Sequence, residues 1–84
     1  MTPQVETRYT TIPKIMRSAA FQRGVAEVRA GRPPDFDGIE DGNDAWDYER
    51  GRQWAVIAPR MMPVMKGRKV NPQAVALFNR SDIR

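Results

Sequence analysis

Two four-residue stretches, Phe21-Gln22-Arg23-Gly24 and Tyr48-Glu49-Arg50-Gly51, decide how this chain folds. In each stretch a glycine follows an aromatic residue by three positions, which places both on one face of a helix. A glycine inside a helix costs about 0.5–1 kcal/mol relative to alanine, so two at equivalent positions indicate a purpose. We predict that two helices cross with Gly24 near Gly51, and that Phe21 and Tyr48 pack on either side. The alternative is two unrelated surface glycines whose shared pattern is a coincidence.

Start and stop signals surround both stretches. A serine cap and a glycine followed by two prolines predict a helix over about 18–30. An Asn-Asp cap and Pro59 bound a second helix over about 44–58. Asn71 caps a third helix, about 72–81, that has proline at its first position. The predicted fold class is therefore all-α: a small helical hairpin plus a short C-terminal helix.

The rest of the chain is assigned by exclusion. Residues 1–17 show no helical stripe apart from a short turn that Pro13 would begin, so we predict a mobile N-terminal arm. Residues 18–84 form a single small helical domain, and no β-hairpin is predicted. A chain of 84 residues has a thin core, with an expected stability of about 3–5 kcal/mol. A homodimer or a bound partner would add stability by mass action.

The composition argues against catalysis. The chain has no cysteine and no histidine, which removes the thiolates, the commonest metal ligand and the commonest general base near neutral pH. The acidic run after residue 34 fits neither register of a calcium loop, because Ile39 occupies a ligand position in both. We expect a non-enzymatic protein without cofactor or metal. No apolar stretch approaches the roughly 18 residues of a membrane span and no signal peptide is recognisable, so the cytoplasm is the expected location.

The net charge of +4 is unevenly distributed. Residues 1–34 hold six basic and two acidic side chains, residues 35–49 hold seven acidic and no basic ones, and residues 50–84 hold eight basic and one acidic. The chain is thus a basic body with one acidic segment, and a partner of either sign can be recruited.

The basic residues are candidates for phosphate contacts. Lys66-Gly67-Arg68-Lys69 is the densest basic cluster and lies on a turn before a helix. Residues 18–58 contain five arginines and no lysine, and arginine both forks onto phosphate and stacks on bases. The candidate nucleic-acid-binding residues are Arg23, Arg29, Arg32, Arg52, Lys66, Arg68 and Lys69. The alternatives are a solvated turn and an internal ion-pair network in which Arg50 and Arg52 pair with the acidic residues.

The acidic segment suggests a different use. A cluster of carboxylates imitates the phosphates of a nucleic acid and can occupy a basic groove on another protein. Trp46 falls off the inward face of the second helix and is expected to be exposed. The candidate partner-binding residues are Asp35, Asp37, Glu40, Asp41 and Trp46. The alternative is a flexible, solubilising loop.

Ala20-Phe21-Gln22-Arg23-Gly24, Ala30-Gly31-Arg32, Trp46 and the run 48–55 resemble the bacterial ribosome modulation factor family. The resemblance covers about residues 18–58. It implies two short helices with internal glycines that bind ribosomal RNA on the small subunit and promote ribosome inactivation. This sequence departs from the family in its acidic inter-helix segment, in residues 1–17 and in the third helix.

Two hypotheses follow. The first is a small regulator that associates with the ribosome or with structured RNA. The alternative is a phage or mobile-element inhibitor, of the anti-CRISPR or anti-restriction type, that binds a host nucleic-acid-processing protein complex through its acidic loop.

Overall fold

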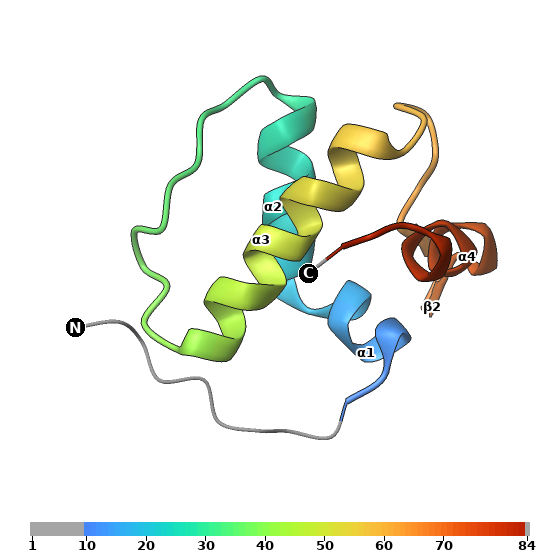
Figure 1. The fold of residues 1–84 in the computed structure, drawn as a ribbon, viewed down its shortest axis with the longest axis horizontal. Helices are drawn as coiled ribbons and strands as arrows, with labels where there is room; N and C mark the ends of the chain where they lie inside the picture. Colours follow the sequence, from blue (N-terminus) through green and yellow to red (C-terminus); the bar gives the residue numbers. More distant parts are fainter. Residues whose placement is uncertain (1–9, 84) are drawn as a thin grey trace.

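The computed structural model describes residues 10–83 and is mostly helical, which confirms the all-α class. Its elements in chain order are α1 (Ile12–Arg17), α2 (Ala19–Arg29), α3 (Gly42–Ile57), β1 (Met65–Lys66), β2 (Lys69–Val70) and α4 (Pro72–Arg80) (Figure 1). None of these helices combines the length and apolarity that crossing a bilayer requires.

Helices α2 and α3 cross at the two predicted glycines. A Cβ atom on Gly51 would lie 2.1 Å from the carbonyl oxygen of Phe21, and one on Gly24 would lie 2.3 Å from the carbonyl oxygen of Tyr48. Side chains do not approach a backbone this closely, so only glycine permits the observed crossing. Phe21 and Tyr48 are fully buried beside it. The predicted structural role of these four residues is confirmed.

The two helices run in the same general direction (Figure 1). At their C-terminal ends, the guanidinium of Arg29 reaches the carbonyl oxygen of Pro59 at 3.5 Å. The connection over residues 30–41 therefore returns along the whole pair instead of turning tightly between antiparallel helices. The start and stop signals located the helices but carried no information on their relative direction.

The N-terminal boundary differs from the prediction. Residues 1–9 of the expected arm lie outside the described residues, but residues 12–17 form α1 and bury Ile15 and Met16 in the core. Thr11 caps this helix. Ser18 ends it by donating to the Ile15 carbonyl at 2.7 Å and starts α2 by accepting from the Phe21 amide at 3.1 Å. The domain thus begins before residue 18, because one serine joins two short helices.

A small β-hairpin precedes α4, contrary to the prediction of none. Met65 pairs with Val70 and Lys66 with Lys69, around a two-residue loop whose first residue, Gly67, has a φ of +63°. A positive φ at the first loop position is what type II′ hairpin turns require, and glycine adopts it without strain. Strands of two residues leave no alternating apolar pattern, which is why the sequence did not reveal them.

The core lies between the α2–α3 pair on one side and α1 and α4 on the other. Phe21 lies 6.1 Å, between ring centroids, from both Trp54 and Phe78. The buried indole of Trp54 donates to the carbonyl oxygen of Ala74 at 3.2 Å, which fixes α4 against α3.

Candidate nucleic-acid interface

Glu27 of α2 organises the arginines of the helix pair. Its carboxylate accepts hydrogen bonds from the hydroxyl of Tyr48, from Arg23 at 2.8 Å and from Arg52 at 3.4 Å. The hydrogen bond from Tyr48, followed by that from Arg23, lowers the pKa of Glu27 below its ordinary value. The hydrogen bond to Glu27 also raises the pKa of Arg23. The negative charge at this position is therefore stabilised by three neighbours.

The same arginines hold the connection between α2 and α3 in place. Arg23 donates to the carbonyl oxygens of Asp35 at 2.7 Å and Asp37 at 3.0 Å. Arg52 donates to the carbonyl oxygen of Arg32 at 3.0 Å, and the Tyr48 hydroxyl accepts from the Asp35 amide at 2.9 Å. Arg23 and Arg52, both predicted to contact nucleic acid, are instead used within the fold.

Arg29 is also used within the fold. Its guanidinium donates to the carbonyl oxygen of Met62 at 2.6 Å and lies 5.4 Å from the ring centroid of Trp54. It therefore joins the end of α2 to the segment that follows α3.

The predicted ion-pair alternative holds for part of the chain. Arg50 pairs with the buried Asp47 at 3.2 Å, as expected. Arg52 pairs with Glu27, which lies outside the acidic segment. The sequence placed the network correctly on the arginines but missed its central carboxylate.

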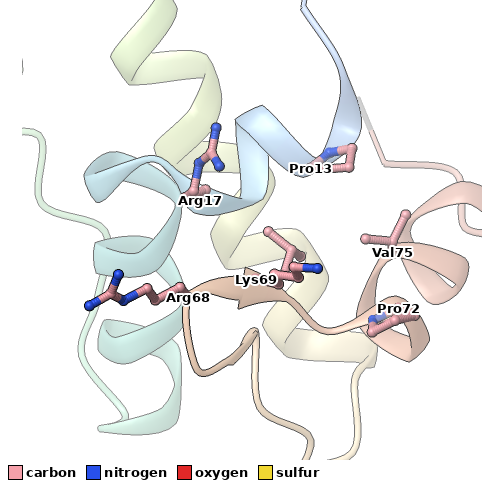
Figure 2. Close-up of a pocket in the computed structure, with 7 residues that line it drawn as sticks. Pro13, Arg17, Arg68, Lys69, Pro72 and Val75 are labelled. Atoms are coloured by element: carbon pink, nitrogen blue, oxygen red, sulfur yellow. The ribbon is translucent and has the colours of Figure 1, made fainter.

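Three other cations gather at one depression, which we call the basic groove. It lies where α1, β2 and the start of α4 meet, has a volume of about 440 Å³, and is shown in Figure 2. Its lining consists of Pro13, Arg17, Arg68, Lys69, Val70, Pro72 and Val75. Within residues 10–83, no carboxylate forms an ion pair with its three cations, which are all exposed.

The local fold explains this gathering. The Gly67 turn places Arg68 in the hairpin loop and Lys69 at the start of β2, where Val70 is half-buried below them. Arg17 ends α1, and in Figure 2 its guanidinium points upward, whereas that of Arg68 points to the left, away from the other labelled residues. Arg17 was missed by sequence reasoning, because residues 1–17 were assigned to an arm. The Thr-Ile-Pro start signal at Thr11 would have found α1.

The remaining basic candidates divide. Lys66 is exposed on β1, next to the groove in the same hairpin. Arg32 is exposed beyond the end of α2 and does not line the groove. Asn71 is almost fully buried, and both ends of its side-chain amide are paired. The nitrogen donates to the carbonyl oxygen of Pro63 at 2.9 Å, and the oxygen accepts from the Gln73 amide at 3.1 Å. It caps α4 as predicted.

The four acidic candidates are all exposed, but two of them also have partners within the fold. Asp35 pairs with Arg23 at 3.8 Å and accepts from the Asp37 amide, while Asp41 caps α3 by accepting from the Asn43 amide at 2.7 Å. Glu40 is exposed.

Trp46 is exposed as predicted, and Arg50 lies 5.3 Å from its ring centroid. The loop that precedes α3 lies on the opposite side of the molecule from α1, β2 and α4 (Figure 1).

Comparisons of the chain with protein-family models, with curated proteins and with solved structures found no match. The resemblance to the ribosome modulation factor family therefore stays a prediction from the sequence.

Proposed function

We propose that this protein is a non-enzymatic binding protein that contacts structured RNA through the basic groove and the neighbouring Lys66. The ribosome is the first partner to test, because the family resemblance of residues 18–58 implies it. The alternative is an inhibitor that imitates nucleic acid with its acidic loop. A salt titration of RNA binding distinguishes the two.

One observation carries the proposal. Of the chain's arginines, Arg23, Arg29 and Arg52 neutralise or bridge parts of the fold, whereas Arg17 and Arg68 contact no carboxylate of the described residues. Exposed cations that are not needed by the fold are free to displace the counterions of a phosphate backbone, which is the main source of affinity in such complexes.

The acidic segment supports the alternative less well. Asp35 and Asp41, two of its four candidate carboxylates, already have internal partners in Arg23 and in the first turn of α3. A phosphate-imitating surface needs carboxylates that are free to meet a basic partner. The internal hydrogen bonds of these two residues reduce what the loop offers.

A salt titration of RNA binding tests the proposal. Fluorescence anisotropy with a labelled structured fragment of ribosomal RNA measures the association constant at each salt concentration. The logarithm of this constant should fall linearly with the logarithm of the salt concentration, with a slope of about 0.7–0.9 per phosphate contacted. The triple variant Lys66→Ala/Arg68→Ala/Lys69→Ala should reduce that slope by the amount that about three phosphate contacts contribute. Cosedimentation with ribosomal subunits would then show whether the ribosome itself is bound.

The control removes two exposed cations elsewhere, one fewer than the triple variant. Arg32→Ala/Arg80→Ala changes side chains that are exposed and lie outside the groove lining, so affinity should change little. No binding of RNA at low salt would disprove the proposal. Capture of a nucleic-acid-processing protein complex that depends on Asp37 and Glu40 would favour the inhibitor instead.

A further inference from the structure

We infer that the basic groove binds the backbone of a nucleic-acid duplex and not a single strand. This inference rests on the proposed function and specifies the form of RNA that the groove selects. Three features of the described residues support it: the absence of aromatic rings, the chemistry of the groove, and the position of the acidic segment.

No aromatic ring of residues 10–83 lines the groove. Proteins that hold single strands stack the unpaired bases on exposed aromatic side chains, which supply a large part of the affinity. Here Phe21, Tyr48 and Trp54 are fully buried. The two exposed rings of the described part of the chain, Phe36 and Trp46, lie in and just after the acidic loop, where phosphates are repelled. On the residues that the structure describes, a single strand would therefore find no stacking partner where it finds positive charge.

The groove does offer what a paired backbone presents. Val70, Val75 and two prolines form the aliphatic part of its lining, and Arg17, Arg68 and Lys69 supply the charge. In a duplex the bases are turned inward, so a protein meets ridges of sugar and phosphate. Sugar carbons match the aliphatic part of the lining and phosphate oxygens match the cations. Contacts of this kind recognise shape and charge without reading sequence.

The acidic segment limits how the duplex is held. Residues 35–49 carry seven carboxylates and no cation, and the loop that begins this segment lies across the molecule from the groove (Figure 1). Wrapping of nucleic acid around the protein would bring phosphates against these carboxylates. The duplex is therefore held on one face, over a short length.

The test compares one RNA in two forms. A labelled RNA duplex of about two helical turns and its unstructured single strand are titrated with the full chain, by anisotropy at low salt. The duplex should bind at least about tenfold more tightly than the single strand. Arg17→Ala/Arg68→Ala/Lys69→Ala should remove most of the duplex affinity, while Arg32→Ala/Arg80→Ala should retain it. Circular dichroism melting of both variants verifies that they fold.

Each outcome has one meaning. Equal or tighter binding of the single strand would overturn the inference and leave RNA binding intact. Duplex binding that survives loss of the three groove cations would also overturn it, by moving the site elsewhere. Polyglutamate that competes with the duplex at matched charge would show that the groove takes acidic protein instead. Failure to bind either RNA at low salt would disprove the proposed function itself.

Discussion

Gly51 of α3 lies directly against Phe21 of α2, with 2.1 Å between the position a Cβ would take on Gly51 and the Phe21 carbonyl oxygen. The reciprocal contact joins Gly24 to the Tyr48 carbonyl at 2.3 Å. Each aromatic-x-x-Gly stretch therefore supplies a glycine that receives the backbone of the other. The pair of stretches is a single packing unit, although 27 positions separate the two glycines in the chain.

Gly51→Ala should destabilise the fold by about 1–3 kcal/mol, because the added methyl group forces the two helices apart. Against an expected total of about 3–5 kcal/mol, this is a large loss. Urea unfolding followed by circular dichroism measures it. Ala26→Val adds more atoms at an exposed position of α2 and should cost about 0.5 kcal/mol or less. An unchanged midpoint for Gly51→Ala would show that the crossing tolerates a side chain.

Gly24→Ala and Gly51→Ala should not be additive. Both act on the same helix crossing, so once one methyl group has separated the backbones, the second meets less resistance. We expect the double variant to lose at least about 0.5 kcal/mol less than the sum of the single losses. A double-mutant cycle in a stabilising cosolvent such as sulfate keeps all four proteins folded enough to measure. Losses that add within about 0.3–0.5 kcal/mol would mean that the two contacts are independent.

The helix crossing was predictable from the sequence because its cause is local. A glycine within a helical pattern has a recognisable cost, and Phe21 and Tyr48 mark the buried face. Cap signals likewise predicted α4, since Asn71 and Pro72 act within one turn of the chain.

The basic groove was not predictable, because it depends on contacts between distant segments. The sequence treats Arg23 and Arg68 alike, as exposed cations near helices. Only the fold shows that Arg23 is held by Glu27 and by carbonyl groups of the loop, whereas Arg68 is not. Arg17 joins Arg68 only because the short helix α1 packs beside the β-hairpin.

Tyr48→Phe should lower the free energy of unfolding more at neutral pH than at acid pH. The hydroxyl of Tyr48 is the main reason that the pKa of Glu27 is lowered. A carboxyl whose pKa is lower in the folded state adds stability that is complete above its unfolded pKa, about 4.3, and is lost as the pH falls through the folded value. The stability difference between wild type and Tyr48→Phe should therefore shrink as the pH falls below about 4.

Urea unfolding from about pH 7 to about pH 3 measures this difference. In a Glu27→Gln background, Tyr48→Phe should have an effect that no longer varies with pH over that range, since the titrating partner is gone. The hydrogen bond from the Asp35 amide to Tyr48 accounts for a part that is independent of pH in both backgrounds. If the difference in free energy of unfolding between the wild type and Tyr48→Phe stays constant down to about pH 3, the assigned role of Glu27 is contradicted.

Arg29→Met and Arg68→Met should separate stability from binding. Methionine keeps an apolar stem but donates no hydrogen bonds, so Arg29→Met leaves the Met62 carbonyl without its charged donor. Losing such a bond costs about 1.5–3 kcal/mol, which lowers Tm by several degrees or more in a domain of this size. Arg68 is exposed in the hairpin loop and pairs with no carboxylate of the described residues. Arg68→Met should therefore leave Tm nearly unchanged and reduce the salt slope of RNA binding by about one.

The two variants remove the same charge, so charge loss alone predicts equal effects on both measurements. The assignment of the two arginines would be reversed if Arg29→Met, measured at a temperature where it is folded, reduced the salt slope of RNA binding while Arg68→Met left that slope unchanged.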